Sequence, residues 1–320
     1  MKRLFAAILL VMSFSAFSYE TSCLASYTPW FTGPLLNFTA TNLARGEFYF
    51  QPTLLVFHTY GNYDENWNLQ NGPDTLSINP SLDFQMGITD RFGLEVTASL
   101  ISNWKQGRQS TRLEDTIFIL GYQILEDISG SWRPNFRIDL IEIIPTGSYN
   151  KLNPQNLGTD STGEGSFQTG FVLIVKKTFP VKSHYLSLEG SFSYFFPASV
   201  HVQGFNAYGG GFNTRGTVHP GDSWALNLSA EYSLSQRWGI ILETIFEYQA
   251  KSTFSGKPGF LKPGIPAEVG LPSSFSWSLA PEIEYNFTSK FGMLFGMWLT
   301  LLGRNTDAFY SGFLSFVYTF

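Results

Sequence analysis

The sequence has a single cysteine, Cys23, among its 320 residues. No internal disulfide can form, so hydrogen bonding and burial must supply the stability of the fold. Charged side chains make up only 14% of the chain, whereas a typical soluble domain carries about 25%. Beyond the first residues, no apolar run approaches the roughly 18 residues that a membrane-spanning helix requires. These shortages exclude a disulfide-rich scaffold and helical membrane spans, and they argue against an ordinary water-facing surface.

The chain is instead rich in aromatic residues, which make up 17% of it. Many apolar side chains occupy every second position over stretches of about ten residues, as in a strand that exposes alternate residues to lipid. A closed barrel is the other structure, besides the helix, that satisfies every backbone polar group in a bilayer. The sequence therefore predicts an all-β fold, a transmembrane antiparallel up-and-down β-barrel.

The amino terminus has the pattern of a secretory signal peptide. Lys2 and Arg3 precede an apolar run over residues 4–14, and Ala16 and Ser18 suit cleavage before residue 19. We expect residues 1–18 to be removed. A lipoprotein is disfavoured, because a glutamate stands where the motif before Cys23 requires an apolar residue.

Three hairpins share one design. The segments 76–88 and 92–104 flank a short polar turn, and each puts apolar side chains on one face and polar ones on the other. The same unit recurs over 224–248 and 275–301. Repetition of this design supports the barrel.

Extending the pattern predicts twelve strands between residues 46 and 320. They cover 46–60, 75–88, 92–104, 113–125, 134–145, 166–179, 184–196, 223–234, 238–250, 274–287, 291–302 and 309–320. In 118–125, 136–144 and 167–179 both faces hold aliphatic residues, so a count two higher or lower stays open.

Long connections alternate with short ones. The long ones are 61–74, 105–112, 146–165, 197–222, 251–273 and 303–308. Because long loops of such barrels are extracellular, we expect both chain ends in the periplasm of a bacterial outer membrane. The Gly-, Asn- and Pro-rich composition of the long loops indicates mobile surface segments.

The chain ends on an alternating run that closes in Phe320. Outer-membrane barrels present such an ending to their assembly machinery, so we expect Phe320 to be an assembly signal, at an aromatic girdle that faces lipid. Lipid and lipopolysaccharide are then the expected surroundings.

Several passages resemble the outer-membrane protein family named after the meta-pathway of phenol degradation. Residues 81–96 resemble its strand-turn-strand, and the Pro-Thr-Gly of 144–147 with the glycine-rich 158–165 resembles its strand end and loop. Residues 281–296, followed by Gly303-Arg304-Asn305, are similar to its last hairpin but one. The resemblance covers about 45–320 and implies a transporter-like barrel without catalytic residues.

The faces assigned to the lumen carry many carboxylates and few bases, Arg137 and Lys176 among them. The acids are Asp83, Glu95, Asp139, Glu189, Glu231, Glu243, Glu247, Glu282 and Glu284. In a wet lumen with low-dielectric walls these acids would concentrate cations, so we expect a cation preference. The alternative is that they only solvate the lumen or pair with bases from turns and loops.

Paired acids also raise the question of catalysis. Glu282 and Glu284, two residues apart on one strand, share a face at about 6–7 Å, which is permissive for an acid and base pair. A barrel with this many inward acids produces such pairs by chance, and we expect no enzyme. The four histidines, His58, His184, His201 and His219, match no metal motif, and His58 has no obvious acidic neighbour.

The segment 19–43, before the barrel at 44–320, shows no strand alternation. Its apolar part comprises Trp30, Phe31, Gly33, Pro34, Leu35 and Leu36. An apolar periplasmic segment needs a place to bury itself. We expect it either to fold into the lumen as a plug or gate, or to pack against the barrel rim.

The sequence thus favours a channel for passive passage of small solutes, hydrophobic or aromatic ones included. A structural or surface-interaction barrel acting through its loops is the alternative, and a lipid-modifying barrel enzyme is the third reading. No cofactor or metal is expected. Nucleic-acid binding is disfavoured by the net charge of −5 and by export.

Overall fold

The computed structural model describes Tyr27 and residues 29–320. The expected signal peptide, its cleavage site and Cys23 lie outside the described residues. Among the described residues, no helix is long and apolar enough to cross a membrane.

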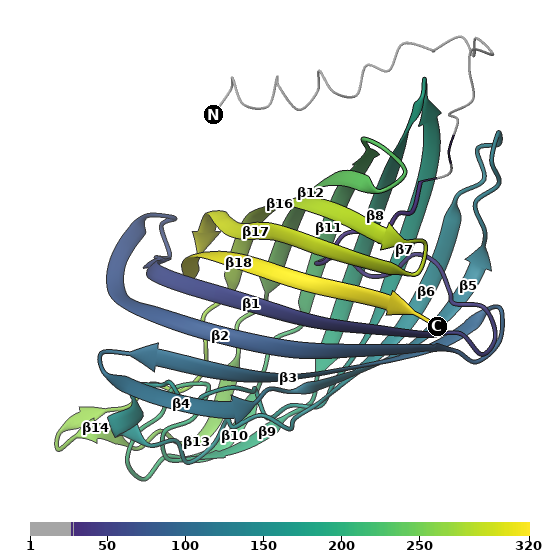
Figure 1. Ribbon diagram of the computed structural model, residues 1–320. Helices are drawn as coiled ribbons and strands as arrows, with labels where there is room; N and C mark the ends of the chain where they lie inside the picture. The colour runs from purple at the N-terminus through teal and green to yellow at the C-terminus, as the bar shows by residue number, and fades with distance from the viewer. Residues whose placement is uncertain (1–26, 28) are drawn as a thin grey trace.

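Twelve antiparallel strands form a closed ring, in which β1 pairs with both β2 and the last strand, β18 (Figure 1). The strands of the ring are β1 (Phe48–Tyr63), β2 (Leu69–Gly87), β3 (Phe92–Lys105), β5 (Thr116–Leu125), β6 (Asn135–Ile144), β7 (Gln168–Val181), β8 (His184–Pro197), β11 (Ser223–Ser233), β12 (Trp238–Gln249), β16 (Ser274–Thr288), β17 (Phe291–Arg304) and β18 (Thr306–Thr319). Closure gives each of these twelve strands a partner on both sides. The all-β barrel and its twelve strands confirm the prediction.

The two faces of each strand differ as the pleat requires. In β12, Ile240 and Leu242 are exposed on the outside, whereas Ile241 and Glu243 are buried inside. Most exposed large apolar side chains of the ring lie on this outer face, which is the surface that a bilayer would cover. The inner face is mainly polar and charged.

One end of the barrel carries short turns and the other carries long loops. The turns at 88–91, 182–183, 234–237 and 289–290 lie at the end called here the turn end, together with Phe320, which pairs with Phe48 there. The connections 145–167, 198–222 and 250–273 lie at the opposite, loop end. Both ends of the barrel sequence therefore meet at the turn end.

Three of the expected long loops are wrong. The expected loops 61–74 and 303–308 are largely strand, because β1, β2, β17 and β18 continue past the apolar stretch as polar hairpins. The expected loop 105–112 contains β4 (Arg108–Leu113), which pairs with β3 across a tight turn at Gln106 and Gly107. Both turn residues have positive φ, 48° and 75°, which fits a two-residue hairpin turn.

The wall of the barrel is interrupted between β4 and β5. Both strands pair with β3, one along its loop-end half and the other along its turn-end half. Glu114 and Asp115 stand at the break. Asp115 accepts the amides of Gly147 and Glu164 at 2.8 and 2.9 Å, and these bonds hold the 146–165 connection against the break.

The longest connections fold into a cap rather than irregular loops (Figure 1). Its elements are η1 (Pro154–Asn156), β9 (Val200–Gln203), β10 (Arg215–His219), β13 (Thr253–Lys257), β14 (Phe260–Lys262) and β15 (Ile265–Pro266). Val200, Val202, Tyr208 and Val218 form its apolar core. The sequence indicated mobile loops because turn-forming residues dominate their composition, and the composition does not show that short strands pair across two connections.

Candidate functional site

The segment 29–43 lies inside the barrel rather than against its rim. It contains no strand, and its backbone amides bond to inward-facing side chains more than 200 residues away in sequence. The Thr32 amide donates to Glu284 at 2.8 Å, and the Leu36 amide donates to Glu243 at 2.8 Å. In Figure 1 the dark purple trace of this segment passes behind the near-wall strands.

Every amide that can donate between Thr32 and Leu36 faces a carboxylate. Leu35 donates to Glu282 at 3.4 Å, and Gly33 makes a looser contact with Glu231, whose oxygens have no well-aligned donor. Pro34 has no amide hydrogen. The four acceptors, Glu231, Glu243, Glu282 and Glu284, are called the glutamate cradle below. Pro34 therefore has no amide donor to satisfy at its position.

Strand register brings the glutamate cradle together. Glu231 lies on β11, Glu243 on β12, and Glu282 and Glu284 on β16. Glu282 stands opposite Ile241 and Glu284 opposite Gly239, so these inward positions of β16 lie beside Glu243 along β12. Adjacent strands are about 4.8 Å apart, so the four carboxyl groups form one patch.

Side-chain amides serve the carbonyl groups of the same segment. Asn227 donates to the Leu36 carbonyl at 3.0 Å, and Asn286 donates to the Trp30 carbonyl. Asn37 bonds to Ser191 and Ser229. These polar groups of the segment are thus paired with the wall, as buried backbone groups require.

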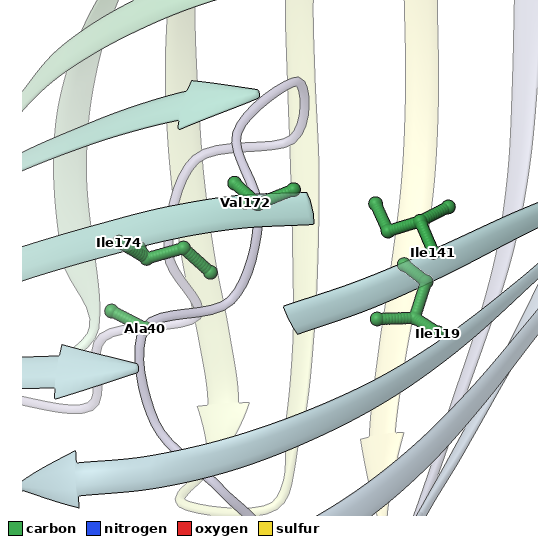
Figure 2. Packing of buried hydrophobic residues seen from close by; sticks show 5 residues of the cluster. All are labelled: Ala40, Ile119, Ile141, Val172 and Ile174. Atoms are coloured by element: carbon green, nitrogen blue, oxygen red, sulfur yellow. The ribbon is translucent and has the colours of Figure 1, made fainter. Parts of the chain in front are cut away.

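The later part of the segment packs against an apolar patch (Figure 2). Ala40, 2% exposed, contacts a cluster formed by Ile119, Ile141, Val172 and Ile174 of β5, β6 and β7. These strands are those in which the sequence showed aliphatic residues on both faces. The inward aliphatic residues give the segment an apolar surface to cover, which explains the weakened alternation there.

Charged side chains of the inner wall also lie close to the segment. The Arg137 guanidinium donates to Asp139 at 2.6 Å and to the Thr41 carbonyl at 3.2 Å. Lys176 lies 3.3 Å from Glu189 and 3.8 Å from Glu231. Asp139 and Glu189 are therefore paired with bases.

Trp30 lies at the turn end of the segment. Its amide donates to the Gln236 carbonyl at 3.2 Å, and the Arg237 guanidinium lies 5.8 Å from its ring centroid. This second attachment, to the turn between β11 and β12, fixes the point at which the segment passes into the barrel.

A cavity of about 310 Å³ remains beside the segment. One side is formed by residues 31–41 and the other by inward residues of β1, β2, β3 and β5. Asp83 and Glu95 face it, whereas Glu247 lies nearer the loop end and accepts a hydrogen bond from Ser276 at 2.7 Å. The expected lumen acids thus divide into cradle, ion-paired and cavity-facing groups, with Glu247 apart.

Sequence reasoning missed several residues at these sites. Asn227, Asn286 and Ala40 carry no signal of their own, because their role depends on a segment distant in sequence. On the β3–β4 hairpin, Lys105, Arg108 and Arg112 share the inward face of Asn103. They were missed because this hairpin was assigned to a loop.

The histidines lie apart from the lumen cavity. His58 lies 3.5 Å from Asp74, so the expectation that it has no acidic neighbour is wrong. The sequence predicted a loop at Asp74, whereas Asp74 belongs to β2. His201 and His219 bond to hydroxyl groups of Thr217 and Ser199. The described residues contain no cluster of three metal-ligating side chains.

Comparison with known proteins gives a family match and a fold match. Residues 109–295 match the family described as "Putative MetA-pathway of phenol degradation". No curated protein matches the sequence. An outer membrane channel from Pseudomonas putida F1 is 12% identical with a TM-score of 0.67, over 90% of this chain and all of that one. This likeness shows a shared barrel fold.

Two further solved structures are similar at lower scores. The Pseudomonas putida toluene transporter TodX is 9% identical with a TM-score of 0.39, over 85% of this chain and 89% of its own. The CymD monoaromatic hydrocarbon channel is 11% identical with a TM-score of 0.36, over 87% and 89%.

Proposed function

The chain belongs to the family described as "Putative MetA-pathway of phenol degradation", and from this premise we propose that it is an outer-membrane channel for small solutes, closed at rest by residues 29–43. The observation that carries the proposal is the attachment of this segment inside a closed barrel. Its contacts are mainly hydrogen bonds between backbone and side chains. A segment held in this way can leave without breaking the barrel wall.

The proposed orientation follows from the two ends of the barrel. The turn end, with both ends of the barrel sequence, faces the periplasm, and the cap lies outside the cell among lipopolysaccharide. In this proposal residues 1–18 are the export signal and residues 19–43 the periplasmic segment, of which residues 29–43 enter the lumen. Phe320, half exposed beside Phe48, is the proposed contact for the assembly machinery.

The proposed cation preference rests on fewer acids than the sequence suggested. Four acids hold the segment, and Asp139 and Glu189 are paired with bases. Asp83 and Glu95 then face solutes in the cavity while the segment is docked. Undocking exposes the glutamate cradle, so cation preference increases in the open channel.

The cavity supports the passage of apolar or aromatic solutes. Leu55, Ile117, Ile119 and Leu294 line it together with polar residues. A mixed lining of this kind accepts a small apolar body and orients its polar group.

One observation favours a second function, as a barrel that binds a partner through its cap. Phe212, Leu261 and Ile265 are about half exposed on the cap although it has a core of its own. Exposed apolar groups gathered on one surface often mark a contact site.

Proteoliposome uptake separates the two functions. We expect liposomes containing the full chain to take up small aromatic solutes slowly, and liposomes containing a chain without residues 30–36 to take them up faster. The two proteins must show the same heat-modifiable folding. Equal rates in both, at the level of empty liposomes, contradict a channel and leave the surface-interaction barrel.

A further inference from the structure

The cavity beside the segment has walls of two kinds. Leu55, Ile117, Ile119 and Leu294 contribute apolar surface, whereas Asp83 and Glu95 contribute carboxyl groups from adjacent strands. Gln85 and Glu95 are cross-strand partners, as are Asp83 and Thr97, so the two acids stand at neighbouring inward levels. A molecule in the cavity would meet carboxyl groups at one part of its surface and aliphatic groups at another.

The nearby positive charge is already engaged. The Arg137 guanidinium donates to Asp139 at 2.6 Å and to the Thr41 carbonyl at 3.2 Å. Lys176, which also lines the cavity, is paired with Glu189 and Glu231. Among the described residues no base is hydrogen-bonded or ion-paired to Asp83 or Glu95, so carboxyl groups outnumber the free bases on this side of the cavity.

Hydrogen-bond donors are scarce on the same wall. Gln85 and Thr97 both donate to Asp83, at 2.8 and 3.2 Å, and Tyr49 donates to Gln51 at 2.7 Å. Glu95 accepts no hydrogen bond from the described residues. The wall therefore offers mainly carboxyl acceptors, and a carboxylate or phosphate would find few donors there.

We propose that this cavity binds a small organic cation, a protonated amine with an apolar body. An ammonium group has up to three donors and no acceptor, which complements the excess of acceptors around Asp83 and Glu95. Its apolar body would lie against Leu55, Ile117 and Ile119. A neutral alcohol has one donor and adds an acceptor, so it matches this wall less well.

The size of the cavity restricts the ligand. Its volume of about 310 Å³ is at the lower end of the roughly 300–1,000 Å³ of small-molecule sites. A single ring or a short alkyl chain with one amine fits this range. The inference rests on the proposed channel function, for which it names the class of solute.

Equilibrium binding to the detergent-solubilised full chain tests the inference without requiring transport. Isothermal titration at pH 7 compares benzylamine, benzyl alcohol and benzoate, which share a ring and differ in charge. We expect benzylamine to bind at least tenfold more tightly than benzyl alcohol, and benzoate not to bind. Equal affinities for amine and alcohol overturn the proposal.

Two isosteric variants locate the site. Glu95→Gln and Asp83→Asn should each weaken benzylamine binding at least tenfold. Glu247→Gln removes an inward acid outside the cavity and should change it less than twofold. If Glu95→Gln and Asp83→Asn both bind like wild type, or if Glu247→Gln weakens binding equally, the cavity is not the site.

The outcomes separate this inference from the channel itself. Amine binding without solute uptake into proteoliposomes contradicts the channel and keeps the site. Solute uptake with no preference for amines contradicts the site and keeps the channel. The ligand comparison on the wild-type chain stands even if a variant fails to fold.

Discussion

Weakening the glutamate cradle should release the segment from the barrel. The double variant Glu243→Gln/Glu284→Gln keeps the shape of both side chains and removes their charge. Each carboxylate accepts a segment amide at 2.8 Å, from Leu36 and Thr32 respectively. The variant leaves the segment sequence intact, so only its attachment changes.

The size of the effect follows from these two bonds. A hydrogen bond to a charged acceptor contributes about 1.5–3 kcal/mol, and one to a neutral acceptor about 0.5–1.5 kcal/mol. The loss is about 1 kcal/mol per site and about 2 kcal/mol for both. Because 1.36 kcal/mol is a factor of ten, the ratio of undocked to docked segment should rise about 30-fold.

Single-channel recording in planar bilayers measures this ratio as the ratio of open to closed time. Glu247→Gln is the matched control. Glu247 lies on the same strand as Glu243 and also points inward, but its carboxylate contacts Ser276 rather than the segment. We expect the control to gate like wild type. If the double variant folds and also gates like wild type, the cradle does not hold the segment closed.

Three further predictions concern the segment and the cap. Ala40→Leu overfills the cluster around Ala40, at a cost of about 1–3 kcal/mol, so the open probability should rise about 5- to 150-fold; an unchanged open probability contradicts docking at that cluster. Asp115→Ala removes the acceptor of two amides and should weaken the attachment of the 146–165 connection by about 1–3 kcal/mol, seen as faster proteolysis there than in wild type. Burial and the neighbouring Asp115 raise the pKa of Glu164 above its ordinary value of 4.5. The folded cap then binds this proton more tightly than the unfolded cap, so wild type loses stability as the pH rises above 4.5 towards the raised pKa. Relative to wild type, Glu164→Gln should therefore slow hydrogen exchange in the cap at pH 8 and not at pH 4. If the variant and wild type exchange equally at both pH values, the raised pKa is contradicted.

The barrel could be predicted because its signal is local. In hairpins such as 76–104, lipid on one side and a polar interior on the other impose a period of two. The inner face is also apolar at Ile119, Ile141 and Val172, because a segment distant in sequence covers those residues. The alternation of apolar and polar residues is therefore weak there. The strands there were still found from their neighbours.

The arrangement of the site could not be predicted from the same pattern. The alternation of side chains along a strand identifies Glu243 and Glu282 as inward-facing, but it does not show what they contact. Their contacts are amides of residues 32–36, some 200 residues earlier, and no local pattern links them. The prediction of irregular loops was wrong for a related reason, because the cap depends on pairing between β10 and β13 across two connections.

The central claim is that residues 29–43 occupy the lumen and close it. The conductance of a chain lacking residues 29–41, compared with that of the full chain in planar bilayers under a KCl gradient, tests it most directly. We expect larger steps from the truncated chain, with a reversal potential that shows cation preference. Identical conductance and reversal potential in the two proteins, both correctly folded, would contradict the claim.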